Sequence, residues 1–269
     1  MSGAQGRTNG LIGFLPIAIG GPPANAIEDS AYFACPKMQL EVPGSSVSLV
    51  TLHLSQLEFC SVHPEEEALL QGNVAEKRRS EFALGRAAAR LALIEQGFTD
   101  PPPVLKGTGR EPAWPKGIVG SITHCGPWAV AAVANDRFVW ALGIDLEDID
   151  AVPHNEIGDI VCSEAERDWV FGGRDTRLRL AMLFSAKEAI YKALFPLCRK
   201  FFDFHDADLT WFPQRGCFLG KLCTDLSPEF PKGFSFEVDC RRRANFVFTR
   251  ATIEAHNRTT ADEQESSAI

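Results

Sequence analysis

Two acidic residues separated by one position give the first indication of chemistry in this sequence. Asp145 and Glu147 occur in the segment Gly143-Ile144-Asp145-Leu146-Glu147. Because side chains alternate along a strand, both carboxylates would lie on one side of it, where their charges repel unless a cation lies between them. Oxygen-only ligands favour a hard divalent ion such as magnesium over zinc. The segment indicates a magnesium site, and the alternative is a solvated acidic strand end.

A further acid, Glu188, occurs in a segment with the periodicity of a helix. Ser185 and Glu188 fit the S-x-x-E spacing of a helix capping box. Glu188 and Lys192 also fit a favourable i,i+4 ion pair. Ser163 and Glu166 show the same capping-box spacing with no chemistry attached. On spacing alone Glu188 is a structural residue, and only its combination with the other motifs indicates a functional one.

Basic residues gather in residues 77–90, although the chain as a whole is acidic. On a helix, Arg79, Arg86 and Arg90 share one face, beside a separate apolar stripe. Guanidinium groups arranged in this way can hold a phosphate through paired hydrogen bonds. The alternative is a solvated helix face.

Thr123 and His124 end a predicted strand. They would present a hydroxyl, an imidazole and backbone amides at the edge of a sheet, and all of these groups suit phosphate oxygens. A single histidine is more often structural, so this segment indicates a phosphate site only in combination with the basic helix.

The elements that must position these residues follow from the hydrophobic pattern and the turn residues. We expect long helices at residues 74–96 and 178–197, a shorter helix at 163–171, and strands at 47–54, 118–123, 129–135, 139–144, 208–212, 217–222, 235–240 and 244–249. A helix followed by antiparallel strands, twice over, predicts an α+β fold of two similar lobes. We expect an extended N-terminal arm (1–45), an N-terminal lobe (46–142), a C-terminal lobe with the metal site (143–254) and a polar tail (255–269).

Composition limits the possible functions. The formal net charge of the 269 residues is -8, which argues against nucleic acid as a partner. The eight cysteines contain no C-x-x-C pair, so we expect reduced thiols rather than a zinc or redox site. No apolar run approaches the ~20 residues of a membrane span. Residues 11–19 imitate a secretory signal, but Gly13 and Pro16 interrupt them and Arg7 alone precedes them, so we expect a cytoplasmic protein.

Taken together and in this order, the motifs resemble the larger, Sfp-like and EntD-like class of 4′-phosphopantetheinyl transferases. That family is marked by G-x-D-x-E and, farther on, by W-x-x-K-E-x-x-x-K. This chain has the first motif complete, and the second with Phe184 in place of tryptophan. The family's G-[KR]-P and S-x-S-H segments are matched with two departures, since Glu111 separates Arg110 from Pro112 and Thr123 replaces a common serine. The resemblance covers about residues 75–250.

The resemblance implies two lobes related by a pseudo-twofold axis, each a mainly antiparallel sheet packed with a long helix, with coenzyme A between them. By the matching positions, Arg79 and Arg86 would hold the 3′-phosphate of coenzyme A, and Thr123 and His124 would complete that pocket. The adenine would be lined by Gly109, Arg110, Glu111 and Pro112.

The same resemblance implies the roles of the acids. Asp145, Glu147 and Glu188 would hold Mg²⁺ against the diphosphate, and Lys192 would reach a phosphate oxygen. Glu188 would act as the base, directly or through a water.

The implied reaction transfers 4′-phosphopantetheine from coenzyme A to a serine of an apo acyl or peptidyl carrier protein and releases 3′,5′-ADP. We expect a monomeric enzyme. One alternative is a module that binds coenzyme A or a carrier protein without catalysis, which would not require three acids beside a diphosphate. Another is a metal-dependent phosphohydrolase, which would need no protein acceptor.

Overall fold

The structure is a computed structural model in which residue 40 and residues 46–255 are described, apart from the side chains of His154 and Asn155. The predicted N-terminal arm and polar tail lie outside the described residues, except for Leu40 and residue 255. The elements of the first half are β1 (Ser48–His53), η2 (Leu54–Phe59), α1 (Pro64–Glu67), α2 (Glu76–Glu95), β2 (Leu105–Lys106), β3 (Pro112–Ala113), β4 (Ile118–Cys125) and β5 (Trp128–Asn135). The second half contains β6 (Val139–Asp148), α3 (His154–Val161), α4 (Glu164–Phe171), α5 (Thr176–Cys198), η3 (Phe204–Asp206), β7 (Ala207–Phe212), β8 (Cys217–Leu222), β9 (Ser235–Arg243) and β10 (Phe246–Glu254).

The strands form two larger antiparallel sheets. The first has the order β1-β5-β4 and the second the order β6-β10-β9-β8-β7, while β2 and β3 make a separate short hairpin. This mixed arrangement of helices and antiparallel strands confirms the predicted α+β class at that level. Strand β6 pairs with β10 from Val139 to Asp148, so the boundary predicted after residue 142 falls inside one strand of the second sheet.

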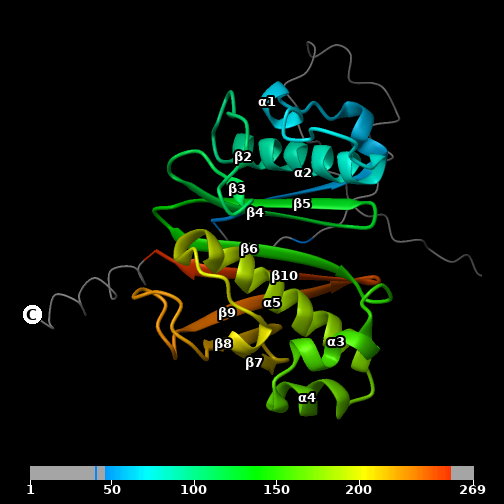
Figure 1. Ribbon diagram of the computed structural model, residues 1–269, viewed down its shortest axis with the longest axis vertical. Helices are drawn as coiled ribbons and strands as arrows, with labels where there is room; N and C mark the ends of the chain where they lie inside the picture. The colour runs from blue at the N-terminus through cyan, green and yellow to red at the C-terminus, as the bar shows by residue number, and fades with distance from the viewer. Residues whose placement is uncertain (1–39, 41–45, 256–269) are drawn as a thin grey trace, which may run out of the picture. The chain divides into compact units, whose positions relative to one another are not determined.

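The described residues stack in four layers: α2, the first sheet, the second sheet and α5 (Figure 1). Strand β5 is buried on both faces, and its side chains alternate between two hydrophobic clusters. Ala129, Ala131 and Val133 pack toward α2, whereas Val130 and Ala132 pack with β6 and β10 between the sheets. The period-two alternation of a strand therefore builds two cores from one segment.

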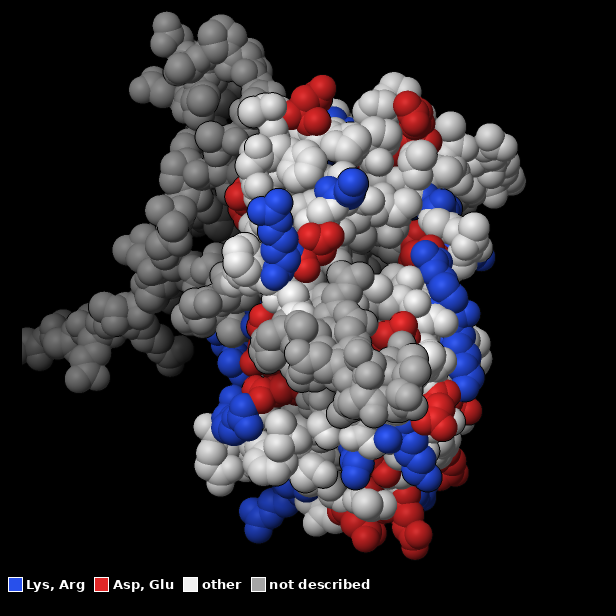
Figure 2. Space-filling model, turned by 90° about the vertical axis from the view of Figure 1, so that its left-hand side faces the viewer, with Lys and Arg blue, Asp and Glu red and all other residues white. Residues whose placement is uncertain are grey.

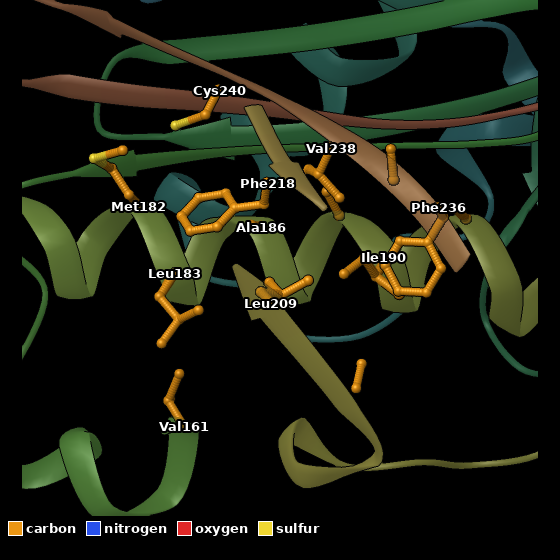
Figure 3. Close-up of a cluster of buried hydrophobic side chains, with 14 of the residues drawn as sticks. Val161, Met182, Leu183, Ala186, Ile190, Leu209, Phe218, Phe236, Val238 and Cys240 are labelled. Carbon is orange, nitrogen blue, oxygen red and sulfur yellow. The ribbon is translucent and has the colours of Figure 1, made fainter. Parts of the chain in front are cut away.

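Helix α5 covers the other face of the second sheet. Its side chains Leu183, Ala186 and Ile190 join the largest cluster, together with Phe218 from β8 and Val161 from the end of α3 (Figure 3). Helix α4 agrees with the helix predicted at residues 163–171. Helix α3 forms where the sequence pattern predicts no helix.

The contact between α5 and β6 is closest at Gly143. A Cβ atom at this position would lie 1.9 Å from the carbonyl oxygen of Ala189 and 2.5 Å from the backbone nitrogen of Ala193. The backbone of α5 therefore rests directly on β6, and only glycine fits. Since Asp145 and Glu147 follow Gly143 at a spacing of two, they face the same helix.

Candidate active site

The two predicted acidic motifs, one on β6 and one on α5, meet where these elements pack together. Lys192 Nζ donates to Asp145 Oδ1 at 2.6 Å and to Thr123 Oγ1 at 3.3 Å. Thr123 on β4 in turn donates its hydroxyl to Asp145 Oδ1 at 3.0 Å. Asp145 is buried, and Thr123 and Lys192 hold one of its oxygens from two other elements. Thr123, predicted to complete a phosphate pocket, contacts Asp145 and Lys192 in this structure.

Burial and like charge raise the pKa of the neighbouring acids. The pKa of Glu147 rises to about 8, first because the carboxyl is removed from water and then because of the charge on Asp145. Burial also raises the pKa of Glu188, with Asp145 adding to the effect and the ammonium of Lys192 opposing it. The acids thus lie close enough to influence one another, as the motif spacing predicts.

The capping-box interpretation of Ser185 and Glu188 is wrong. Helix α5 begins at Thr176, so Ser185 lies inside it and caps nothing. Its hydroxyl is buried and lies 2.8 Å from Thr249 Oγ1 on β10. The box at Ser163 and Glu166 does form at the start of α4. The predicted ion pair of Glu188 with Lys192 is replaced by the hydrogen bond from Lys192 to Asp145.

The acids suit a hard divalent cation in their chemistry. All three donors are carboxylates, and Asp145 Oδ2 is buried without a hydrogen-bond partner among the described residues. Within residues 40 and 46–255, no group of three or more His, Cys, Asp or Glu side chains is gathered tightly enough to hold a metal as it stands. In this arrangement the ammonium of Lys192 supplies the positive charge beside Asp145.

A basic cluster forms where α2 faces the end of β4. Arg86 is buried, its guanidinium carbon lies 4.7 Å from the ring centre of Phe82, and its Nε has no hydrogen-bond partner among the described residues. Burial lowers the pKa of Arg86 to about 10, with Glu66 opposing and Arg78 reinforcing the effect. Arg78 Nη1 lies 2.9 Å from His124 Nε2.

Lys106 belongs to the same cluster. Its pKa is lowered by burial and by the charges of Arg110, Arg78 and Arg86. Lys106 therefore lies within electrostatic reach of Arg78, Arg86 and Arg110. Arg78 links this group to His124, and Glu81 lies 3.7 Å from Arg78 Nη1 and 3.8 Å from His124 Nε2. Burial lowers the pKa of His124 as well. Such a concentration of partly desolvated positive charge suits a small, highly charged anion.

Helix α2 carries all three arginines predicted on one face, but their surroundings differ. Arg79 is exposed, and no hydrogen bond or ion pair joins it to the basic cluster within the described part of the chain. Arg90 instead lies 3.8 Å from the buried carboxylate of Glu66. On the face drawn in Figure 2, basic and acidic side chains are interspersed rather than gathered into one large area of a single sign.

A pocket of about 240 Å³, here called the loop pocket, lies between residues 109–112 and helix α5. Lys192, Tyr191 and Phe195 line its helical side. Gly109 packs closely against this wall, because a Cβ atom there would lie 2.5 Å from the Phe195 ring and would displace it. An ion pair between Glu111 and Arg199, just beyond α5, joins the loop to the helix end.

A second pocket of about 240 Å³, here called the aromatic pocket, lies beside the loop pocket on α5. It is lined by Lys187, Glu188, Ile190, Tyr191, Phe201, Phe202, Asp203, Phe204 and Ala207. Tyr191 borders both pockets, and its ring centre lies 5.2 Å from that of Phe195 and 5.1 Å from that of Phe202. Glu188 therefore lines the aromatic pocket, and Lys192, which binds Asp145, lines the loop pocket.

Sequence reasoning missed several of these residues. Arg78 and Lys106 carry the same charge as their neighbours, and nothing in their spacing separates them from solvated cations. Tyr191, Phe201 and Phe202 surround the second motif, and their clustering is a signal that could have indicated an apolar pocket beside Glu188.

Comparison with known proteins identifies the family of this chain. The model of the 4′-phosphopantetheinyl transferase N-terminal domain matches residues 65–134, and that of the 4′-phosphopantetheinyl transferase superfamily matches residues 141–249. The chain is 43% identical over 164 residues to 4′-phosphopantetheinyl transferase PptT of Mycobacterium tuberculosis, covering 61% of this chain and 71% of that protein. It is 42% identical over 162 residues to 4′-phosphopantetheinyl transferase Npt of Nocardia iowensis, covering 59% and 70%.

Two more distant similarities were found. Enterobactin synthase component D of Escherichia coli is 39% identical over 119 residues, 44% of this chain and 55% of that protein. A solved holo-[acyl-carrier-protein] synthase of Thermotoga maritima is 21% identical and covers 44% of this chain and 64% of its own, with a TM-score of 0.36, which is too low to bear on the fold.

The chain belongs to the 4′-phosphopantetheinyl transferase superfamily, in the Sfp-like and EntD-like class that its motifs predict. Its function is the transfer of the phosphopantetheine group to carrier proteins, and neither the binding-module nor the phosphohydrolase alternative is supported. Among the described residues, no helix has the length and apolar character needed to cross a membrane.

Proposed function

We propose that this chain transfers 4′-phosphopantetheine from coenzyme A to a serine of an apo acyl or peptidyl carrier protein, with release of 3′,5′-ADP, at the junction of the loop and aromatic pockets. The observation that carries the proposal is the grouping of Asp145, Glu147, Glu188 and Lys192, in which Lys192 lines the loop pocket and Glu188 the aromatic pocket. Coenzyme A has a nucleotide end and an apolar arm joined by a diphosphate, and two pockets joined at a charged centre fit that division.

The nucleotide end would occupy the loop pocket and the basic cluster. Residues 109–112 and Phe195 offer a narrow space for the adenine. The buried Arg86, with Arg78 and His124, would bind the 3′-phosphate, because an anion there would offset the positive charge and accept from the unpaired Nε of Arg86. A role for Arg79 in the same contact stays a prediction from the sequence.

Asp145, Glu147 and Glu188 would hold Mg²⁺. Their oxygen-only chemistry and the unpartnered Asp145 Oδ2 support this assignment. When bound, the ion would neutralise negative charge on the diphosphate, which is the main source of catalysis in phosphoryl transfer. Lys192 lies next to Asp145 and lines the loop pocket, so its ammonium would turn to a phosphate oxygen when the diphosphate enters.

The aromatic pocket would hold the pantetheine arm. Its lining is mostly apolar and begins at Glu188, which places the arm on the far side of the acids from the nucleotide. The carrier serine would attack the β-phosphorus, forming the new P–O bond while the bond to the α-phosphate oxygen of 3′,5′-ADP breaks. Glu188 would accept the hydroxyl proton, since burial raises its pKa and so makes it a stronger base.

The symmetry of the fold, the oligomeric state and the cellular location complete the proposal. We propose that the two halves are related by an approximate twofold axis, which is supported by the pairing of one long helix with one antiparallel sheet in each. The monomeric state and the cytoplasmic location stay predictions.

The test is incubation of the full-length chain with coenzyme A, Mg²⁺ and a panel of apo carrier proteins, read by intact mass. We expect one carrier to gain the mass of phosphopantetheine in step with the appearance of 3′,5′-ADP. Consumption of coenzyme A at the same rate without any carrier would indicate hydrolysis and would contradict the proposal.

A further inference from the structure

The lysine of the second motif, Lys187, lies outside the chemistry described above. Its ammonium donates to three oxygens: Glu166 Oε2 at 2.7 Å, the Val161 carbonyl at 2.8 Å and the Phe204 carbonyl at 2.6 Å. The side chains of Lys187 and Glu166 are each only 2% exposed. Since an ammonium has three N–H donors, all of them are used, and Lys187 has none left for a ligand.

Glu166 is equally occupied. Its Oε2 accepts from the backbone N–H of Ser163 at 2.7 Å as well as from Lys187, and its Oε1 accepts from the backbone N–H of Leu209 at 2.8 Å. The pair therefore joins the end of α3, the start of α4, the middle of α5, η3 and β7. Figure 3 shows Val161 at the end of α3 directly below Leu183 of α5.

This pair also lies at the wall of the aromatic pocket. Phe204, whose carbonyl Lys187 binds, lines the pocket, as does the stem of Lys187 itself. Glu188 follows Lys187 on α5 and lines the same pocket. A change in the position of the Phe204 backbone therefore changes the space beside Glu188.

We propose that the buried Glu166–Lys187 pair is a positioning device for the reaction: it holds the 201–204 wall of the aromatic pocket against α5, and so sets how well the pantetheine arm binds beside Glu188. This inference rests on the proposed function. Glu166 lines neither pocket, and Lys187 forms part of the aromatic pocket wall while its ammonium binds Glu166, Val161 and Phe204. Both residues act by holding Phe204 and helix α5 in place.

A purely structural role makes a different prediction. Buried ion pairs contribute little net stability, because removal of both charges from water offsets their attraction. If the pair had only a structural role, breaking it would lower the melting temperature and weaken the binding of every ligand alike. A positioning role affects only the ligand that occupies the aromatic pocket.

Calorimetric titration of coenzyme A and of 3′,5′-ADP, which lacks the arm, separates these roles. For Glu166→Gln we expect the Kd of coenzyme A to rise by about 10-fold, which corresponds to about 1.4 kcal/mol of lost binding of the arm. The Kd of 3′,5′-ADP should stay at the wild-type value. Glu166→Asp retains the charge but shortens the reach, so it should give a smaller change in the same direction and serves where Glu166→Gln does not fold.

Asp239→Asn is the matched control. Asp239 forms an ion pair with the buried Arg250 at 2.7 Å between β9 and β10, and it lines neither pocket. We expect it to lower the melting temperature without changing the ratio of the two Kd values.

The outcomes are distinguishable from failure of the proposed function. If wild-type protein modifies a carrier but Glu166→Gln and Glu166→Asp leave the ratio of the two Kd values unchanged, the positioning role is overturned and the proposed function stands. If wild-type protein binds both ligands equally, the arm makes no useful contact and the positioning role is again overturned. Absence of carrier modification by wild-type protein contradicts the proposed function itself.

Discussion

Replacing Arg86 by methionine should stabilise the ligand-free protein and weaken its binding of coenzyme A. Arg86 is only 6% exposed, and its Nε is unpaired within the described residues. Methionine has a similar length, fills irregular space and carries no charge. The substitution therefore removes a buried cation while keeping most of its packing.

The expected gain in stability follows from the pKa of Arg86. A fall to about 10 makes the charged form unfavourable by roughly 3 kcal/mol, at about 1.4 kcal/mol per pKa unit. Loss of the contact with Phe82 offsets about 1 kcal/mol of this. A net gain of about 2 kcal/mol would raise the melting temperature by roughly 4–8 °C in a protein of this size.

Binding should change in the opposite direction. A charge-assisted phosphate contact contributes about 1.5–3 kcal/mol, so the Kd of coenzyme A should rise by roughly 10- to 150-fold. Dephospho-coenzyme A lacks the 3′-phosphate, and its affinity should not change. Thermal denaturation and calorimetric titration measure both effects on the same sample.

Arg79→Met provides the comparison, because Arg79 is adjacent in sequence but exposed. If the basic cluster binds the phosphate, this variant should change neither property. A lower melting temperature for Arg86→Met with unaltered coenzyme A affinity would refute the reasoning. A loss of affinity in Arg79→Met instead would favour the arginine pair predicted from the sequence.

Three further predictions concern the acids. Asp145→Ala should abolish transfer, measured by intact mass, while leaving the binding of 3′,5′-ADP in place. Chelation of Mg²⁺ should reproduce the loss, and full activity of the variant would exclude Asp145 as a metal ligand. Glu188→Gln should keep a near-normal melting temperature but lose transfer by at least ~100-fold, whereas Ser185→Ala should lose about 1 kcal/mol of stability with its buried hydrogen bond and stay active; the reverse pattern would show that Glu188 is structural. The pKa of Glu147 is raised from about 4.5 in the unfolded chain to about 8 in the folded protein. The folded state therefore holds this proton more tightly, and the stability of metal-free protein should fall as pH rises from about 4.5 to 8. Glu147→Gln should flatten this slope in thermal denaturation across pH, and an unchanged slope would assign it to another group.

Local periodicity was sufficient for the parts of the site that lie on one element. The alternation of a strand places Asp145 and Glu147 on one face wherever the strand lies, because that period belongs to the backbone. The strands and long helices are likewise close to their predicted ranges, since each has a continuous apolar pattern.

Contacts between different elements could not be predicted from local sequence patterns. Arg78 and Arg79 are indistinguishable by type, and which of them reaches His124 depends on where the β4–β5 hairpin ends. The spacing of Ser185 and Glu188 describes a capping box but does not say where the helix begins, and α5 begins earlier. The aromatic pocket requires η3 to return to α5, which no local pattern predicts.

The contact at Gly143 has a consequence for protein engineering. Replacement of glycine by alanine is a common route to thermostable variants, because it reduces the freedom of the unfolded chain. At Gly143 the added methyl group would meet the backbone of Ala189 at 1.9 Å, and a backbone cannot move aside as a flexible side chain can. The helix would have to lift away from β6, and Glu188 and Lys192 would move with it. A screen that measured only the melting temperature would not detect the displacement of Glu188 and Lys192. Libraries built on this scaffold should therefore keep Gly143 constant together with the acids.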